Sequence, residues 1–193
     1  MPQSNPITDM LEAIQAYRNA SKPVFIALDG RSAAGKSTLA AQLARQIHCL
    51  VLHMDDFYLP LANRTAEQMA QPGGHMDYPR LLQEVLLPLH EKQCCSYSAF
   101  DCKQQILLPP ISLFAAPIIL LEGSYSCHPL LWEQADLHCF LDITPQQQAE
   151  RLAMRDRQSA AQFHSVWIPR EEQYFSAYDI RQRCDRILYG TNP

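Results

Sequence analysis

The stretch GRSAAGKST, residues 30–38, is the feature that most restricts how this chain can fold. It matches the spacing G-x-x-x-x-G-K-[ST] through Gly30, Gly35, Lys36 and Ser37. A short apolar run, residues 24–28, stands before it, and a stretch with apolar residues at helical spacing, residues 37–47, stands after it. A phosphate-binding loop requires this order of strand, glycine-containing turn and helix, so we expect the chain to bind a nucleoside triphosphate.

Each residue type in this loop suits the binding of phosphate. The glycines and the small residues between them let the backbone N–H groups of the loop and of the first helical turn point at anionic oxygens. The lysine ammonium can reach the β- and γ-phosphates, and the serine hydroxyl can bind Mg²⁺. We therefore predict ATP and Mg²⁺ as cofactors, with the nucleotide-binding residues Gly30, Ser32, Ala33, Ala34, Gly35, Lys36, Ser37 and Thr38.

The rest of the chain alternates between predicted strands and helices. Apolar runs predict strands at residues 24–28, 50–54, 117–121, 137–143 and 186–189. Helical spacing predicts helices at residues 8–20, 37–47, 79–90, 145–157 and 170–182, while residues 59–79 are irregular and residues 93–116 fit either short strands or a loop. This alternation predicts a three-layer α/β fold of the P-loop NTPase type in one domain, residues 1–193. Its sheet should be mostly parallel, with about five strands and helices on both faces.

Three acidic residues follow predicted strands. Asp55 and Asp56 come after residues 50–54, and Glu122 comes after residues 117–121. The carboxyl ends of parallel strands meet at the edge where the phosphate loop lies, and Mg²⁺ prefers oxygen ligands, so these acids are expected near the triphosphate. A carboxylate there can also accept the proton of an acceptor hydroxyl. Neighbouring strand residues point to opposite sides, so we expect only one of the two aspartates to face the phosphates.

The charge and composition of the chain argue against a nucleic-acid-binding, a membrane-spanning or a secreted protein. A net charge of -4 argues against a general nucleic-acid binder, and no apolar run has the length of a membrane span. The first residues show no basic segment followed by an apolar one, and the seven cysteines form no C-x-x-C pair. We expect a cytoplasmic protein with reduced thiols, whose partner is a small-molecule acceptor rather than nucleic acid or a membrane. Assembly into a homo-oligomer is left open.

Beyond the phosphate loop, the chain resembles the uridine kinase-like family of P-loop kinases, relatives of phosphoribulokinase and bacterial pantothenate kinase. The matching segments run nearly from end to end: MDDFY (54–58), MDYPRLLQEVLLPL (76–89), FD (100–101), LLEGSY (120–125), FLDITPQQQAERLAMRD (140–156) and WIPREEQYF (167–175). The more specific parts are D-x-F-[YF] after the second strand, E-G after a later strand and R-x-x-x-R-D on a lid helix.

The resemblance implies a role for individual residues. It makes Asp55 the catalytic base and implies that Ser37, Asp55 and Glu122 hold Mg²⁺. It places Arg151 and Arg155 on a small lid, at about residues 151–170, where they clamp the triphosphate. Arg155 and Lys36 then act in catalysis with Asp55. The substrate-binding residues it implies are Asp55, Tyr58, Asp77, Phe100 and Asp101, although Asp77 could equally be the N-cap of the helix that follows it.

The function expected from these features is an ATP-dependent phosphotransferase that phosphorylates a hydroxyl of a small metabolite, with a nucleoside such as uridine or cytidine as the first expectation. Nucleoside kinases of this group carry a histidine after the Tyr-Asp pair, and Phe100-Asp101 lacks it. Pantothenate, a sugar phosphate or a nucleoside monophosphate therefore remain alternative acceptors. A GTPase-type switch would need N-K-x-D and D-x-x-G, which the sequence does not contain. A non-catalytic nucleotide-binding module is left open.

Overall fold

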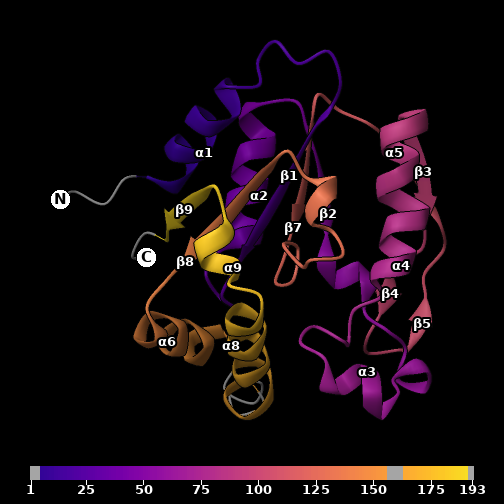
Figure 1. Ribbon diagram of the computed structural model, residues 1–193, viewed down its shortest axis with the longest axis vertical. Helices are drawn as coiled ribbons and strands as arrows, with labels where there is room; N and C mark the ends of the chain where they lie inside the picture. The colour runs from indigo at the N-terminus through magenta and orange to yellow at the C-terminus, as the bar shows by residue number, and fades with distance from the viewer. Residues whose placement is uncertain (1–4, 156–162, 191–193) are drawn as a thin grey trace.

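The computed structural model describes residues 5–155 and 163–190 of the chain. Its centre is a five-stranded sheet in the order β2-β7-β1-β8-β9, and each neighbouring pair of strands is parallel (Figure 1). The strands are β1 (Val24–Gly30), β2 (Cys49–His53), β7 (Ile118–Glu122), β8 (Leu137–Asp142) and β9 (Arg186–Tyr189). The predicted parallel sheet of about five strands is confirmed.

Helices cover both faces of this sheet. Those that pack against it or extend from it are α1 (Pro6–Gln15), α2 (Lys36–Gln46), α4 (Tyr78–Leu81), η3 (Leu82–Leu86), α5 (Leu87–Lys92), α6 (Pro145–Arg155), α8 (Ile168–Ala177) and α9 (Ile180–Arg183). Side chains of β1 alternate between the faces, as a strand requires. Ile26 and Leu28 pack in one cluster with residues of α1 and α2, whereas Phe25 and Ala27 pack in the other with residues of α5 and α8. The predicted three-layer arrangement is therefore confirmed.

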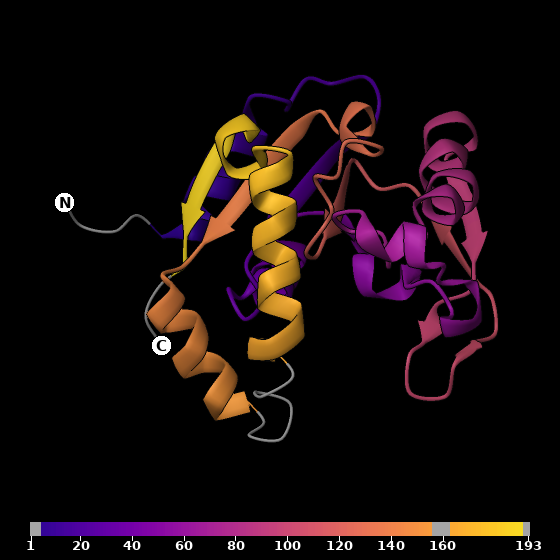
Figure 2. The same ribbon diagram turned by 60° about the horizontal axis from the view of Figure 1, so that its bottom comes forward.

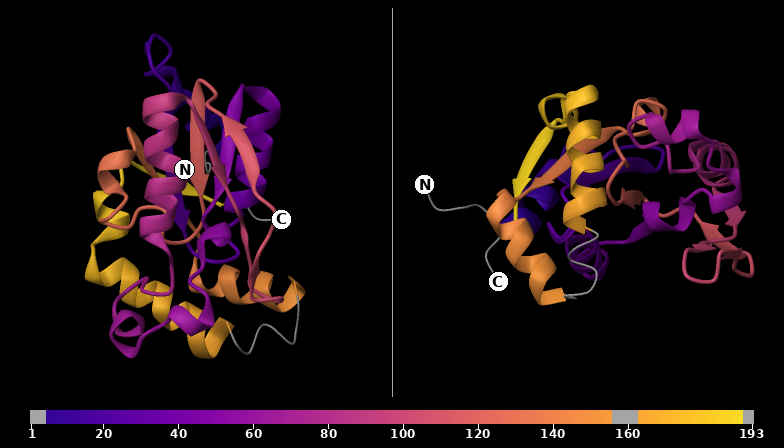
Figure 3. Two further views of the ribbon diagram at one scale, coloured as in Figure 1. Left: turned by 90° about the vertical axis from the view of Figure 1, so that its right-hand side faces the viewer. Right: turned by 90° about the horizontal axis from the view of Figure 1, so that it is seen from below.

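A smaller region lies at one side of the sheet (Figure 1). It contains η2 (Leu61–Asn63), α3 (Ala66–Ala70), β3 (Cys94–Tyr97), β4 (Phe100–Asp101), β5 (Ile106–Leu107) and β6 (Ile111–Phe114). β3 pairs with β6 and β4 pairs with β5, both antiparallel. Seen from below, this region stands on one side of the molecule and α6 on the other, with α8 between them (Figure 3).

The structure differs from the predicted elements where backbone conformation interrupts a periodic pattern. The predicted strand 50–54 ends at His53, because Met54–Phe57 forms a 3-10 turn, η1. The predicted helix 170–182 is two helices, α8 and α9, since Asp179 between them has a φ of +51°. A π-helical turn, η5 (Phe163–Trp167), leads directly into α8, which crosses in front of β8 in Figure 2. The ring centroids of Phe175 in α8 and Phe140 in β8 lie 5.0 Å apart. The helix predicted at residues 8–20 ends at Gln15.

Two glycines make the turn after β1 feasible. A Cβ atom on Gly30 would lie 2.2 Å from the carbonyl oxygen of Leu141, so the neighbouring strand leaves no room for a side chain. Gly35 has a φ of +102°, a conformation that favours glycine. The absence of a side chain on Gly30 lets the loop leave the sheet beside β8. The positive φ of Gly35 lets the chain turn into α2.

Candidate active site

Lys36 is the buried cation at the base of the phosphate loop. It is the first residue of α2, and only 8% of its surface is exposed. Its Nζ donates to the carbonyl oxygens of Gly30 (2.7 Å) and Arg31 (3.0 Å) and to Oγ of Ser124 (3.2 Å). The ammonium is thereby held against the loop, beside the helix N-terminus whose free N–H groups favour anions.

Asp29 ties the start of the loop to two distant segments. Its carboxylate is fully buried and accepts from the N–H groups of Gly30 (2.7 Å), Tyr125 (3.2 Å) and Cys127 (2.9 Å) and from the hydroxyl of Tyr174 (2.8 Å). Burial raises the pKa of Asp29, and the donors oppose this. The sequence marks Asp29 only as the end of a strand, whereas the structure makes it the support of the loop.

A cavity of about 910 Å³ opens in front of the phosphate loop. Six of the eight predicted nucleotide-binding loop residues line it: Ser32, Ala33, Gly35, Lys36, Ser37 and Thr38. Gly30 and Ala34 do not line it; the first turns the chain out of β1, and Ala34 is buried. The opposite wall comes from residues 58–64 and 102–105, so the cavity reaches from the loop to the smaller region.

Two of the three predicted acids face this cavity. Asp55 and Glu122 line it, as does the hydroxyl-bearing Ser37. Asp56 instead accepts a hydrogen bond from the hydroxyl of Tyr97, 2.8 Å away. Within the described residues no three His, Cys, Asp or Glu side chains form a metal site by themselves. Two carboxylates and a hydroxyl beside a phosphate loop do suit Mg²⁺, which keeps water and phosphate oxygens among its ligands.

The electrostatics of the two acids are coupled. The side chain of Asp55 is exposed to the cavity. The cavity walls nevertheless remove part of the water around the carboxylate, and this desolvation raises the pKa of Asp55. The charge of Glu122 raises the same pKa further. Glu122 is nearly buried, and its Oε1 lies 2.6 Å from Nδ1 of His53. That hydrogen bond raises the pKa of His53. A proton acceptor at Asp55 is therefore more basic than an ordinary aspartate.

The residues predicted to bind the acceptor are only partly brought together. Tyr58 lines the cavity, and its hydroxyl donates to Oδ1 of Asp55 at 3.4 Å. Asp77 caps α4 by accepting from the N–H of Arg80 (3.2 Å), which matches the alternative role considered for it. Phe100 is buried in the core, and Asp101 accepts from N–H groups of its own turn. Asp77, Phe100 and Asp101 do not line the cavity.

The predicted lid is described in part. Nη1 of Arg151, on α6, donates to the carbonyl oxygens of Ala33 (3.1 Å) and Ala34 (2.9 Å), and the residue also lines the cavity. The side chain of Arg155, the last residue of α6, lies outside the described part of the chain, as do residues 156–162. Of the two predicted arginines, the structure thus places Arg151 against the phosphate loop.

Three aromatic rings of the site surround a buried histidine. His75 has 2% of its surface exposed, and its ring centroid lies 5.7, 4.7 and 5.4 Å from those of Tyr58, Tyr125 and Trp167, which line the cavity.

Tyr125 has a backbone φ of +76°, which is unusual for a bulky residue and is found most often in functional segments. Sequence reasoning missed Tyr125, although its position just after the E-G pair could have singled it out.

Replacing His75 with phenylalanine is expected to make the free energy of unfolding less dependent on pH. Burial lowers the pKa of His75 to about 3, from an ordinary value of 6.5. Between these values the unfolded chain binds a proton that the folded protein excludes. Stability should therefore fall as the pH falls, by about 1.4 kcal/mol per pH unit for this side chain. Phenylalanine keeps a ring beside Tyr58 and Tyr125 but cannot titrate.

Urea unfolding from about pH 4 to about pH 7 measures this slope in both proteins. His128, whose pKa burial lowers to about 4, titrates in both and so cancels in the difference. Equal slopes for the wild type and the His75→Phe variant would contradict the assignment of a neutral, buried histidine.

Comparisons with known proteins give distant relatives of one kind. No family model matches this chain. It is 25% identical over 149 residues to a uridine kinase of Ureaplasma parvum serovar 3, which covers 72% of this chain and 71% of that protein. A uridine kinase of Ureaplasma urealyticum serovar 10 is 24% identical over the same length.

Solved structures confirm the fold. A protein of Bacillus stearothermophilus described as a possible uridine kinase superposes with a TM-score of 0.74 and 20% identity, covering 95% of this chain and 97% of that one. A protein of Silicibacter sp. TM1040, provisionally assigned as a fructose transport system kinase, gives 0.73 and 18%, covering 95% and 98%. The chain resembles the uridine kinase-like P-loop kinases.

The resemblance to the uridine kinase-like kinases supports a phosphotransferase that uses a nucleotide. It also agrees with the site, in which the phosphate loop and an aspartate of the D-x-F-[YF] segment share one cavity. Among residues 5–155 and 163–190, no helix has both the length and the apolar composition needed to cross a membrane.

Proposed function

We propose that the chain is a kinase that uses ATP and Mg²⁺ to phosphorylate a hydroxyl of a small metabolite. The observation that carries the proposal is that Lys36 and Asp55 line the same cavity. A cation that can bind phosphates and a carboxylate that can accept a hydroxyl proton therefore face one space. Phosphoryl transfer depends on positioning and charge more than on covalent chemistry, so this pairing is what the reaction needs.

In the proposed reaction the loop amides and Lys36 hold the β- and γ-phosphates. The acceptor oxygen forms a bond to the γ-phosphorus, its proton passes to Asp55, and the bond from that phosphorus to the bridging oxygen of ADP breaks. Ser37, Asp55 and Glu122 are the residues that would hold Mg²⁺, which neutralises negative charge on the phosphates when bound. Arg151 and Arg155 are proposed to add positive charge from the lid. Closure of the lid would exclude water, the competing acceptor.

A nucleoside is the first candidate for the acceptor. The names of the relatives, uridine kinases, point to it. Tyr58, Tyr125 and Trp167 on the cavity wall also suit a flat ring or the apolar face of a sugar. The proposal does not rely on Asp77 or Asp101, whose carboxylates serve the backbone of their own segments.

A second candidate is an acceptor with an acid group, such as pantothenate or a sugar phosphate. Arg64 favours it, because this residue lines the cavity on the same side as Tyr58. Its Nε donates to the carbonyl oxygen of Leu59 at 2.8 Å, which fixes the guanidinium at the wall. A guanidinium there could pair with a carboxylate or a phosphate.

The test is a coupled assay of ADP release with nucleosides, nucleoside monophosphates, pantothenate, sugars and sugar phosphates. A nucleoside should raise ADP release at least about tenfold over the rate without an acceptor. Selective turnover of pantothenate or a sugar phosphate, lost in an Arg64→Gln variant, would instead support the second candidate. ATP binding without turnover of any acceptor would refute the kinase and favour a non-catalytic nucleotide-binding module.

A further inference from the structure

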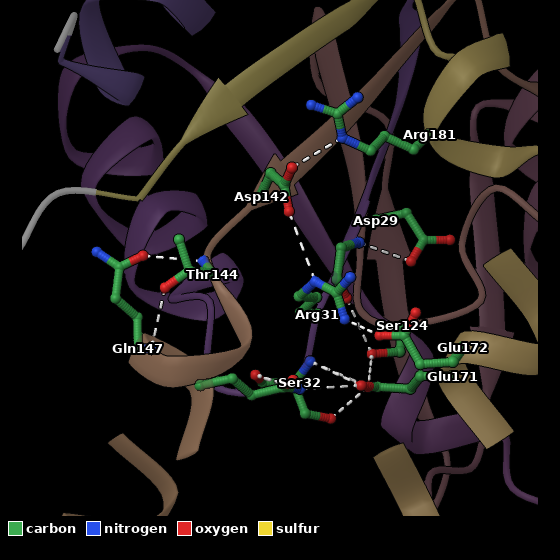
Figure 4. Close-up of polar contacts among 12 residues, drawn as sticks. Asp29, Arg31, Ser32, Ser124, Asp142, Thr144, Gln147, Glu171, Glu172 and Arg181 are labelled. Atoms are coloured by element: carbon green, nitrogen blue, oxygen red, sulfur yellow. Dashed lines mark hydrogen bonds and ion pairs between the residues drawn. The ribbon is translucent and has the colours of Figure 1, made fainter. Parts of the chain in front are cut away.

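A carboxylate from α8 contacts the phosphate loop directly (Figure 4). Glu171 has 2% of its surface exposed and lies at the cavity wall. Its carboxylate accepts from the N–H of Ser32 (3.0 and 3.1 Å), from the Ser32 hydroxyl, from the Ser124 hydroxyl (2.8 Å) and from Nε2 of Gln148 (3.2 Å). The Glu171 carboxylate is thus held by donors from three segments. Two of these donors, Ser32 and Ser124, line the cavity of the proposed active site.

The charge of Glu171 is not explained by an ion pair. Among the described residues, no Lys, Arg or His nitrogen forms a salt bridge with it, whereas its neighbour Glu172 pairs with Arg31. Burial of a carboxylate among neutral donors is costly, and the adjacent loop is suited to binding anions, which this charge repels. A neutral side chain would serve packing alone at lower cost, so the buried negative charge indicates a role beyond packing.

The hydrogen bonds lead from Glu171 to the catalytic lysine. Oγ of Ser124 lies 2.8 Å from Oε1 of Glu171 and 3.2 Å from Nζ of Lys36. A serine hydroxyl has one proton to donate, a carboxylate only accepts, and an ammonium only donates. The Ser124 hydroxyl also lies 3.2 Å from the carbonyl oxygen of Gly30, but the carboxylate oxygen of Glu171 is nearer and charged. Ser124 therefore donates to Glu171 and presents its lone pairs to Lys36. The carboxylate sets the direction of a bond that holds the ammonium.

We propose that Glu171 is a positioning residue for phosphoryl transfer, acting on Lys36 through Ser124 and on the phosphate loop through Ser32. This inference rests on the proposed kinase function. Glu171 lies on α8, which directly follows η5, so it also connects these two elements to the loop. The role differs from nucleotide binding, since the carboxylate opposes the binding of an anion while it orients the groups that act on the transferred phosphoryl group.

The test compares a Glu171→Gln variant with the wild type, by calorimetric binding of ATP with Mg²⁺ and by turnover of the acceptor that the ADP-release assay identifies. We expect kcat to fall about 10- to 100-fold, the effect of losing a hydrogen-bonded charge that orients a catalytic group. ATP should bind within about threefold of the wild type, or more tightly, because a negative charge next to the anion site is gone. Loose packing alone would weaken binding and turnover together.

Two further variants keep the result interpretable. Glu172→Gln removes a carboxylate from the adjacent position of the same helix, and its partner Arg31 does not line the cavity, so kcat should stay within about threefold. Ser124→Ala removes the bridging hydroxyl. Combined with Glu171→Gln it should reduce kcat much less than the product of the two single effects, because both changes break one path to Lys36.

The outcomes separate the two proposals. Normal kcat in Glu171→Gln would overturn the positioning role while the wild type still acts as a kinase, and fully multiplicative effects in the double variant would overturn the path from Glu171 to Lys36 through Ser124. A wild type that binds ATP but turns over no acceptor would refute the kinase, and the inference with it. Weakened ATP binding in proportion to kcat would show that Glu171 is structural only.

Discussion

Replacing Lys36 with alanine is expected to abolish ATP-dependent product formation, with a loss of about 10³-fold or more in kcat. The Lys36 ammonium is the buried cation that the loop holds through the carbonyl oxygens of Gly30 and Arg31. In the proposed reaction it holds the β- and γ-phosphates and balances the charge that develops there. A methyl group at this position leaves that charge without its nearest cation, in a site partly shielded from water.

The measurement is the ADP-release assay with saturating acceptor, together with urea unfolding to establish that the variant is folded. Lys22→Ala is the matched control, because it removes the same group from an exposed position just before β1. We expect this control to retain wild-type turnover. Near-wild-type turnover in Lys36→Ala itself would refute the role given to the phosphate loop.

The phosphate loop and the parallel sheet could be predicted from the sequence because their determinants are local. The loop is one continuous motif between an apolar run and an amphipathic stretch, so no distant contact was needed to place it. The rule that the carboxyl ends of parallel strands share an edge then brought Asp55 and Glu122 toward the loop. The structure places both residues on the cavity beside Lys36.

The acceptor side could not be predicted in the same way, because long-range packing decides it. Asp77 sits next to a helix start, and capping that helix uses its carboxylate. Phe100 belongs to a two-residue strand whose partner, β5, lies in a segment without a clear periodic pattern. Glu171 reads from the sequence as one polar residue of an amphipathic helix, and its contact with Ser32 joins residues 139 positions apart. No local pattern reports such a contact.

Replacing Asp55 with asparagine is expected to reduce kcat by about 10²- to 10⁴-fold while ATP still binds, because an amide cannot accept the hydroxyl proton. Asp56→Asn is the matched control. The Asp56 carboxylate accepts from the hydroxyl of Tyr97, outside the cavity lining, so its loss should lower the free energy of unfolding by about 1 kcal/mol and change kcat less than about tenfold. Calorimetric ATP binding and the ADP-release assay separate the two effects. Reversed severities would show that the wrong member of the pair was chosen.

The pH dependence of turnover gives an independent check on Asp55. A base must be deprotonated to act, so kcat/KM should decline as the pH falls through the pKa of Asp55 in the free enzyme. Desolvation and the charge of Glu122 both raise that pKa, so the decline should begin at a higher pH than an ordinary aspartate would produce. Glu122→Gln removes the like charge and should move this decline to lower pH, provided the variant still binds ATP with Mg²⁺. An unmoved acidic limb would mean that the proton acceptor is a group whose pKa the charge of Glu122 does not raise, and therefore that it is not Asp55.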